Sequence, residues 1–365
     1  MSKKIFSALG IMNGTSVDAI DYALIQSSKN LDAIKFKKHK QFPIPKNLKT
    51  RLLQAASNEL NTYEVSLLHF DLGRLYERHI KSLKKSWKWD VAGVHGQTVH
   101  HEGRVATFQI GHPGFIAKES SRPVVFDFRS NDLICGGQGA PFAPFFQKII
   151  GSQLKQRNFA FHNLGGISNL TLFQSSASKA FDTGPANILL DQWIQKKKKL
   201  NFDRNGAIAA KGLPEPSLVE KFLTHPYFKK KAPKSCGREE FNFDFLKKYG
   251  GKSFEKLSIE DQMATLVDFT ALSISKAYSQ EFKKPPQTIY FYGGGVYNSF
   301  LMKRIQYYLP STKLLTTDDI LWPSQAFEAS TFAFLALARF LGKKIHIPKV
   351  TGSKKRCHLG QIYSL

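Results

Sequence analysis

A short segment near the start of the chain combines a glycine turn with hydroxyl and carboxylate side chains. Gly14, Thr15 and Ser16 are followed by Asp18 and Asp21 within eight residues. Backbone N–H groups of such a turn bind phosphate oxygens, and hydroxyls and carboxylates suit the magnesium ion that accompanies a phosphate chain. The segment therefore indicates phosphoryl transfer, although a purely structural hairpin turn would have the same composition.

A second segment of the same kind occurs about 150 residues later. Gly165 and Gly166 are followed by Ser168 and Asn169. Either turn alone is weak support for a site, but two such turns facing each other would clamp a triphosphate. The pair therefore favours a nucleotide-binding function over two unrelated hairpins.

Asp182 is the candidate general base for such a reaction. It follows a short strand and precedes a helical stretch that begins near Pro185, and polar residues at strand ends are where α/β proteins place their sites. The same spacing would also allow Asp182 to cap that helix. Both interpretations remain open at this point.

The segment Gly293, Gly294 and Gly295 follows a predicted strand at 288–292 and would permit the close approach of a flat ligand such as adenine. No Gly-x-Gly-x-x-Gly sequence with a later acidic residue occurs, which disfavours a dinucleotide-binding Rossmann site. No Gly-x-x-x-x-Gly-Lys-Ser/Thr sequence occurs either, which excludes the common P-loop enzymes.

Other polar residues lie where strands end or where a charge is unexpected. His95 follows a predicted strand at 91–94, and Arg129 follows another at 122–128. The histidines of this region lack the spacing of a transition-metal site. Glu328 is the only carboxylate in an apolar stretch at 324–341, and a lone charge in such a helix is costly unless it faces a ligand or a partner.

The elements that must position these residues recur in two halves. A strand, glycine turn and strand span residues 5–25, and the same device returns at 158–173. Helical patterns follow in both halves. This alternation predicts a two-domain α/β fold with an interdomain cleft, with domain I at 1–145 completed by 343–365 and domain II at 146–342.

Composition narrows the class of protein. The 365 residues carry a net charge of +25, but the lysines and arginines are scattered and form no aromatic-interleaved stripe, so specific nucleic-acid binding is not expected. No apolar run is long enough for a membrane span, and no cleavage site follows the apolar start of the chain. Three distant cysteines support neither a disulfide framework nor a zinc site. A cytoplasmic protein is expected.

Taken in order along almost the whole chain, these segments resemble the anhydro-N-acetylmuramic acid kinase family, whose fold is the two-domain actin-like ATPase fold, a duplicated ribonuclease H-like arrangement. Nine or more ordered matches make chance similarity remote. The matching segments are Gly10 to Asp18, His95 to Thr98, Gln109 to Gly111, Asp127 to Arg129 with Asp132, Gly136 to Pro141, Asn163 to Asn169, Phe181 to Pro185 with Asn187, Lys234 to Glu239, Gly293 to Gly295 with Asn298, and Thr316 to Asp318.

The resemblance implies an activity. Such an enzyme uses ATP and magnesium to open the 1,6-anhydro ring of anhydro-N-acetylmuramic acid and to phosphorylate the freed 6-oxygen. The product, N-acetylmuramic acid 6-phosphate, belongs to peptidoglycan recycling and amino sugar catabolism. A homodimer is the family expectation.

The resemblance also assigns roles. Asp182 would activate water as the general base, Asp18 would lie near the magnesium ion, and Arg129 would meet the lactyl carboxylate, because a guanidinium fork matches that group in shape and charge. The phosphates and adenosine would be met by Gly14, Thr15, Ser16, Asp18, Gly165, Gly166, Asn169, Gly293, Gly294, Gly295 and Asn298. The sugar would be met by His95, Gln97, Thr98, Arg129 and Glu328.

Three positions depart from the family pattern. Asn13 stands where Ser is commoner, Ala19 stands where Gly is usual, and His112 stands where Asp is usual. The first two lie near the phosphate turn and bear on nucleotide affinity, while His112 bears on the sugar pocket. None of the three removes a candidate catalytic group.

Two other functions fit part of the pattern. An ordinary sugar kinase of the same fold would phosphorylate a hydroxyl without hydrolysis. A nucleotide-gated binding protein would close on ATP and present its basic surface to an acidic partner. Asp182 and Arg129 together argue against the binding protein, because a binding module has no need of a base beside a carboxylate clamp.

Overall fold

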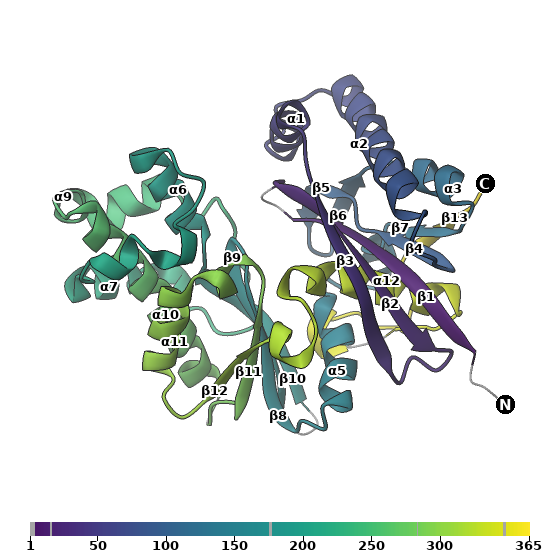
Figure 1. The fold of residues 1–365 in the computed structure, drawn as a ribbon. Helices are drawn as coiled ribbons and strands as arrows, with labels where there is room; N and C mark the ends of the chain where they lie inside the picture. Colours follow the sequence, from purple (N-terminus) through teal and green to yellow (C-terminus); the bar gives the residue numbers. More distant parts are fainter. Residues whose placement is uncertain (1–3, 15–16, 175–176, 283, 346–347) are drawn as a thin grey trace. The chain divides into compact units, whose positions relative to one another are not determined.

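The structure is a computed structural model that describes residues 4–14, 17–174, 177–282, 284–345 and 348–365 (Figure 1). It divides into two compact units: unit 1 comprises Met1–Lys155 and Leu321–Leu365, and unit 2 comprises Gln156–Ile320. Residues 146–155 and 321–342 thus belong to unit 1, whereas the sequence analysis expected them in the second domain. The reason is packing, since α12 (Phe327–Phe340) lies across strands of the first sheet and also contacts α5 (Ala143–Gln153).

The first sheet has the strand order β13-β7-β4-β1-β2-β3. The predicted opening hairpin is confirmed: β1 and β2 are antiparallel, and their register pairs Asn13 with Ile20. β3 extends the hairpin, β4 runs parallel to β1, and β7 runs parallel to β4. The strands are β1 (Ile5–Asn13), β2 (Ala19–Ser28), β3 (Ile34–Pro43), β4 (Val91–Val94), β7 (Val124–Phe126) and β13 (Gln361–Tyr363).

The second sheet repeats this arrangement, with the strand order β10-β9-β8-β11-β12. β8 pairs antiparallel with β9, β9 pairs antiparallel with β10, and β11 lies parallel between β8 and β12. Directions and neighbours therefore match the series β3-β2-β1-β4-β7 of the first sheet, which has β13 in addition. This match confirms the predicted duplicated two-domain fold. The strands are β8 (Asn158–Leu164), β9 (Ile167–Gln174), β10 (Ala177–Pro185), β11 (Thr288–Tyr292) and β12 (Lys313–Thr316).

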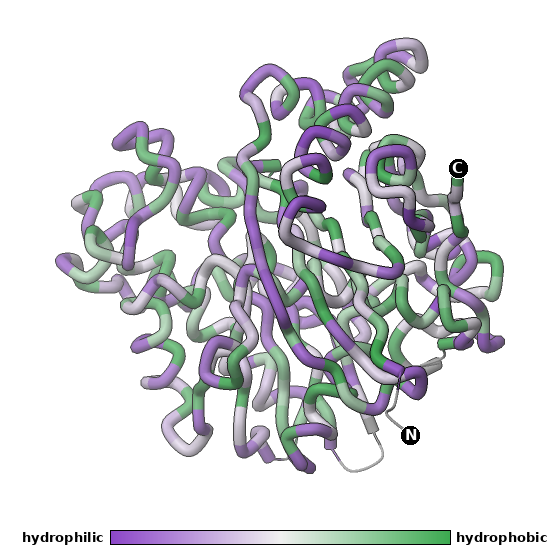
Figure 2. The backbone as a smooth tube through the Cα atoms, turned by 45° about the vertical axis from the view of Figure 1, so that its right-hand side comes forward, coloured by the Kyte–Doolittle hydropathy of each residue, from purple (hydrophilic) through white to green (hydrophobic). Residues whose placement is uncertain are grey.

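The helices are amphipathic or wholly buried, and Figure 2 shows hydrophobic and hydrophilic residues alternating along them. Unit 1 also contains α1 (Lys46–Ala56), α2 (Thr62–Leu83), α3 (Gly114–Ser120), α4 (Ser130–Ile134), α13 (Pro348–Thr351) and the hairpin of β5 (Gln97–Glu102) and β6 (Ala106–Ile110). Unit 2 contains α6 (Ile188–Lys198), α7 (Pro216–Leu223), α8 (Phe243–Phe245), α9 (Gly251–Glu255), α10 (Ile259–Glu281) and α11 (Ser299–Tyr308).

Sequence signals explain where α2 begins and how it packs. The side chain of Asn61 accepts a hydrogen bond from the Glu64 N–H at 3.0 Å, and the Glu64 carboxylate accepts one from the Asn61 N–H at 2.9 Å. This capping box satisfies two donors at the helix start. Leu68, Leu72 and Leu75 then form the buried stripe that holds α2 in the unit 1 core.

Close packing brings α12 against the first sheet. A Cβ on Gly10 of β1 would lie 1.8 Å from the carbonyl oxygen of Ala329, so only glycine permits this approach. Ala329 and Ala333 are fully buried beside it. The contact fixes the first turn of α12, which carries Glu328, against the centre of the sheet.

The basic residues of β3 protect an edge of the first sheet. Lys35, Lys37, Lys38 and Lys40 are exposed on this outermost strand, where lysines oppose edge-to-edge aggregation. Part of the positive charge therefore has a structural use. Within the described residues, none of the helices has the length and hydrophobicity that a membrane span requires.

Candidate active site

In unit 1, the buried His95, which follows β4, pairs with the half-buried Arg129, which follows β7 and precedes α4. The Nδ1 of His95 lies 2.8 Å from the carbonyl oxygen of Gly96, and because a carbonyl only accepts, Nδ1 carries the proton. Nε2 is therefore the acceptor, and it receives the Nε–H and Nη2–H of Arg129 at 3.2 and 2.9 Å. The imidazole also packs on Phe332 of α12, with ring centroids 4.5 Å apart.

Electrostatics keep this histidine neutral. Burial, the charge of Arg129 and, to a smaller extent, that of His101 lower the pKa of His95 to about 3, although the Gly96 hydrogen bond opposes the shift. Burial also lowers the pKa of Arg129 to about 10, while the carboxylate of Glu328 acts in the opposite direction. Arg129 therefore remains a cation and His95 a neutral acceptor at physiological pH.

The glycine-rich segment 136–139 orients Arg129 from the other side. Nη1 of Arg129 donates to the Gly139 carbonyl at 2.7 Å. The buried carboxylate of Asp132 accepts from the Gly139 N–H at 2.8 Å and from the Thr351 hydroxyl at 2.9 Å. Asp132 therefore holds the segment rather than a ligand, a role that its spacing in the sequence did not indicate.

Gln97 belongs to a buried polar chain under the first hairpin. Asn13 donates through Nδ2 to the Gln97 side-chain oxygen at 2.5 Å, and its own oxygen accepts from the Tyr76 hydroxyl at 2.9 Å. Asn13 and Gln97 are almost fully buried. Asn13, which departs from the family pattern, thus has a hydrogen-bond partner for both its amide nitrogen and its amide oxygen. Thr98, the residue after Gln97, is a half-buried residue of β5.

The first turn supplies one exposed carboxylate. Asp18 forms an ion pair with Lys49 of α1, and Asp21 accepts from His39 at 2.7 Å. Asp21 is thus tied to its own sheet, while Asp18 projects from the turn. Thr15 and Ser16 lie outside the described residues.

In unit 2, Asp182 lies within β10 and is held mainly by backbone groups. Its carboxylate accepts from the Cys236 N–H at 3.0 Å, and its own N–H donates to the Lys234 carbonyl at 3.0 Å. The Tyr227 hydroxyl donates to the Asp182 carbonyl at 2.5 Å. The alternative role as a helix cap is wrong, because α6 begins at Ile188, with Asn187 at the N-cap position.

Burial raises the pKa of Asp182 to about 6, the Cys236 N–H opposes the shift and Glu240 adds to it. A carboxylate with a pKa near neutrality is a stronger base than an exposed one and is still ionised at pH 7. Asp182 thus has the protonation behaviour of a general base.

The second glycine turn leaves open space above its backbone. Asn187 holds the turn by donating through Nδ2 to the Gly165 and Leu164 carbonyls at 2.7 and 2.9 Å. A Cβ on Gly166 would meet nothing closer than 3.9 Å, and one on Gly165 nothing closer than 3.4 Å. Glycine at 166 is therefore not required by packing, which is consistent with a ligand approaching the bare backbone.

The space available to a Cβ also differs among the three glycines that follow β11. Gly293 has a φ of 88°, and a Cβ on Gly295 would lie 2.6 Å from the Leu164 Cβ, so the fold itself requires both. Gly294 has open space instead. Asn298 caps α11 by accepting from the Leu301 N–H at 3.0 Å, so its side-chain oxygen serves the helix.

Unit 1 thus contains Gly14, the group of His95, Arg129 and Glu328, and the pair of Gln97 with Asn13. Unit 2 contains Asp182, Asn169 and the glycines at 165–166 and 293–295. Sequence reasoning gave no role to Tyr227, which lies 45 residues from Asp182 along the chain. No local spacing could have revealed that contact.

His112 is a structural residue of the α2–α3 region, where its Nδ1 accepts from the Gly114 N–H at 3.0 Å.

Comparison with known proteins supplies the family. Relatives named anhydro-N-acetylmuramic acid kinase include those of Pseudomonas syringae pv. tomato, 36% identical over 98% of this chain and 99% of the relative, and of Idiomarina loihiensis, 37% identical over 96% and 97%. A Bacillus cereus relative of the same name is 36% identical over 97% of this chain and 98% of its own.

Among solved structures, the activator of the 2-hydroxyisocaproyl-CoA dehydratase from Clostridium difficile aligns over 93% of this chain and all of its own, with 12% identity and a TM-score of 0.45. The assignment does not rest on that likeness. It rests on the sequence relatives and on the family model for anhydro-N-acetylmuramic acid kinase, which matches residues 6–365. The chain therefore belongs to the anhydro-N-acetylmuramic acid kinase family, a family of kinases.

Proposed function

We propose that the protein uses ATP to open the 1,6-anhydro ring of anhydro-N-acetylmuramic acid and to phosphorylate the freed 6-oxygen. The products are N-acetylmuramic acid 6-phosphate and ADP, which places the reaction in peptidoglycan recycling. The observation that carries the proposal is Asp182, a partly buried carboxylate with a pKa raised to about 6 and an oxygen held by the Cys236 N–H.

Asp182 accepts a proton from a water molecule as the water oxygen bonds to the anomeric carbon. The bond between that carbon and the 6-oxygen breaks, and the 6-oxygen bonds to the γ-phosphorus as the bond from that phosphorus to the ADP oxygen breaks. The proton remains on Asp182 until product release. Each bond formed is matched by one broken, and one base serves both steps.

The sugar is positioned by unit 1. The bonds to His95 and Gly139 use three of the five N–H groups of Arg129, and the other two point the guanidinium at the lactyl carboxylate. Neutral His95 fixes the plane of that fork. Gln97, Thr98 and Glu328 complete the sugar-binding set.

The nucleotide is held by the glycine turns. The backbone N–H groups at Gly14, Gly165 and Gly166 cradle phosphate oxygens, with Thr15, Ser16 and Asn169 as side-chain donors. Gly293, Gly294 and Gly295 flank adenosine, with Asn298 acting through the start of α11.

Magnesium fits this arrangement through Asp18. The described residues contain no cluster of three or more acidic, histidine or cysteine ligands, but magnesium on a nucleotide needs only one or two carboxylates beside the phosphates. The side chain of Asp18 is 66% exposed, and its pairing with Lys49 is readily exchanged. When bound, the ion neutralises phosphate charge during transfer.

The test is product analysis after reaction in oxygen-18 water with ATP, magnesium and anhydro-N-acetylmuramic acid. The proposal expects a phosphorylated sugar with one heavy oxygen at the anomeric position, formed by the wild type and not by Asp182→Asn. Phosphorylation without the label would instead establish an ordinary sugar kinase.

A matched control is Asp191→Asn, since Asp191 lies in α6 on the same unit and is absent from the proposed chemistry. Full labelled turnover by Asp191→Asn beside loss in Asp182→Asn would attribute the effect to the base. Equal loss in both variants would contradict that role.

A further inference from the structure

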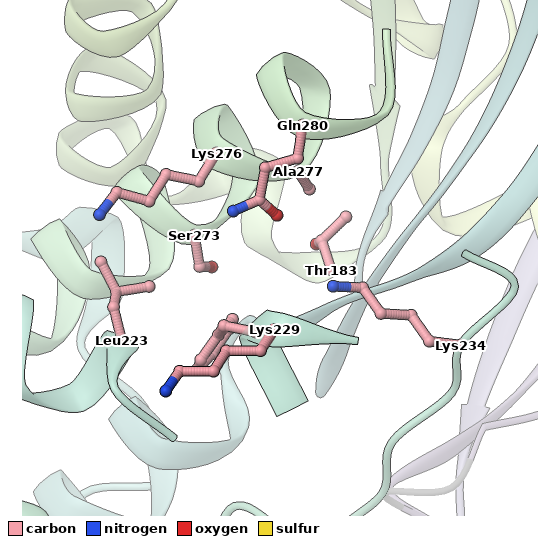
Figure 3. A pocket seen from close by; sticks show the side chains of 9 residues that line it. Thr183, Leu223, Lys229, Lys234, Ser273, Lys276, Ala277 and Gln280 are labelled. Atoms are coloured by element: carbon pink, nitrogen blue, oxygen red, sulfur yellow. The ribbon is translucent and has the colours of Figure 1, made fainter. Parts of the chain in front are cut away.

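Unit 2 contains a small cavity that the proposed reaction does not use. It has a volume of about 140 Å³, roughly ten times the ~15 Å³ that one water molecule needs. Its polar lining comes from Thr183, Lys229, Lys234, Ser273, Lys276 and Gln280 (Figure 3). The walls are the C-terminal half of α10, the 3-10 turn Pro226–Lys229 and β10.

Three lysines line this one cavity, so its surroundings carry a positive charge that would attract an anion. Figure 3 shows the ammonium groups of Lys229 and Lys276 on one side and that of Lys234 on the other, beside Thr183. Lys276 is paired with Glu220 at 3.0 Å. Within the described chain, neither Lys229 nor Lys234 makes an ion pair.

Nearby carboxylates balance only part of this charge. Glu281 is already engaged by the Ala232 N–H at 2.9 Å and by Lys179 at 3.4 Å. Burial lowers the pKa of Lys234, while Glu281 opposes the shift. An anion in the cavity would therefore favour the charged form of Lys234, which burial disfavours.

One neutral donor completes the lining. In Figure 3 the side-chain amide of Gln280 points into the cavity, and an amide donates through its nitrogen. The Ser273 and Thr183 hydroxyls donate elsewhere, to the Thr270 carbonyl at 2.8 Å and to the Ser168 hydroxyl at 2.6 Å. Ammonium and amide donors on several sides suit a group with several acceptor oxygens, of which a phosphate is the compact example.

The cavity shares its walls with the groups that hold Asp182. Thr183 is the next residue of β10, and the Lys234 carbonyl accepts the Asp182 N–H at 3.0 Å. Tyr227, whose hydroxyl bonds to the Asp182 carbonyl, belongs to the same turn as Lys229. An occupant would thus lie beside Thr183, the residue that follows the proposed base in the sequence.

From the cavity, the three lysines and the convergent donors, we infer that unit 2 has a second anion site, which binds a phosphate group, either as inorganic phosphate or at the end of a small phosphomonoester. The site is separate from the glycine turns and goes beyond the proposed reaction. Its occupancy is measured by binding, so it does not depend on the identity of the sugar substrate.

The experiment titrates the full-length protein with inorganic phosphate and, separately, with glucose 6-phosphate as a phosphomonoester probe. Binding is followed by calorimetry in the presence of saturating ADP and at constant ionic strength set with chloride. The variants are Gln280→Glu, which introduces a negative charge at an exposed helix position, and Lys229→Met. Lys303→Met is the matched control, an exposed lysine of α11 that does not line the cavity.

We expect saturable binding by the wild type and by Lys303→Met, and at least tenfold weaker binding by both cavity variants. Tighter binding of glucose 6-phosphate than of inorganic phosphate would identify the phosphomonoester as the occupant, and the reverse order would identify the free ion. No saturable binding of either probe, or equal binding by Gln280→Glu and the wild type, would overturn the inference. A protein that binds phosphate here but gives no labelled sugar would retain this site and lose the proposed function.

Discussion

Asn169 lies directly opposite Asp182 in the antiparallel pair of β9 and β10. Opposite residues of such a pair project from the same face of the sheet, with Cβ atoms about 5 Å apart. Asn163 is in turn opposite Asn169 across β8 and β9. The proposed base and the amide donor of the glycine turn are therefore aligned by strand register, and a bulge between Asp182 and Gly184 shifts the register beyond them.

The first prediction concerns the pH dependence of turnover. Because the pKa of Asp182 is raised to about 6, the base is protonated and inactive below that value. The plot of kcat/KM against pH should therefore fall on its acidic side with a midpoint near 6. A midpoint near 4, the value of an exposed carboxyl, would show that burial does not tune this base.

The same shift predicts the stability of Asp182→Asn. A raised folded-state pKa means that the folded protein binds the proton more tightly than the unfolded chain, so stability falls as pH rises from about 4 to about 6 and the cost persists above that range. Above pH 7 the free energy of unfolding of Asp182→Asn should be about 2 kcal/mol higher than that of the wild type. Urea unfolding at pH 4 and pH 8 tests this, since the difference should largely vanish at pH 4.

Substitutions at Gly166 and Gly295 should distinguish a glycine that serves nucleotide binding from one that the packing requires. Gly166→Ala should leave the free energy of unfolding unchanged, because its Cβ has space, yet weaken ATP binding at least tenfold. Gly295→Ala should destabilise the protein by about 1–3 kcal/mol through overpacking. Denaturant unfolding and nucleotide titration on both variants give the comparison, and equal ATP affinity of Gly166→Ala and the wild type would remove that turn from the nucleotide site.

Arg129→Met should change the titration of His95. Burial is the main cause of the low pKa of His95 and the charge of Arg129 the second, so the pKa should rise by about one unit and stay below 6.5. NMR titration of the imidazole measures it. His162 is the internal control, because burial alone lowers its pKa, and a parallel rise there would indicate general loosening instead.

Substitutions in the buried hydrogen-bond chain of Tyr76, Asn13 and Gln97 should lower the free energy of unfolding by different amounts. Tyr76→Phe removes one hydrogen bond to Asn13 and should cost about 1 kcal/mol. Asn13→Leu leaves both the Tyr76 hydroxyl and the Gln97 side chain without their partner and should cost about 2–4 kcal/mol. Urea unfolding of the two variants checks the order, and equal costs would show that Gln97 finds another partner.

Much of the framework could be predicted from local pattern. The hairpins at 5–25 and 158–173, the strand at 91–94 and the long helix around 263–277 were all predicted and are confirmed, because apolar periodicity and glycine turns act over short distances. β3 was not predicted, since its exposed lysines hide the strand pattern. The helix expected at 324–341 begins at Phe327, after a 3-10 turn.

Less of the candidate site could be predicted from the sequence. The pairing of His95 with Arg129 joins strand ends 34 residues apart, and the Tyr227 and Cys236 contacts reach Asp182 from 45 and 54 residues away. Such contacts depend on tertiary packing, which spacing along the chain does not encode. The resemblance named the candidate segments, but only the fold shows which backbone groups hold each side chain.

The discontinuity of unit 1 has a consequence for biosynthesis. Its sheet gains β13 and its covering helix α12 from residues that follow unit 2 in the chain, so the ribosome exposes β1 and the hydrophobic face around Gly10 long before their partners exist. Unit 2 is continuous and can fold as soon as it emerges. A chain that ends before residue 321 would therefore lack both α12 and β13, and its first sheet would be left without the helix that covers Gly10.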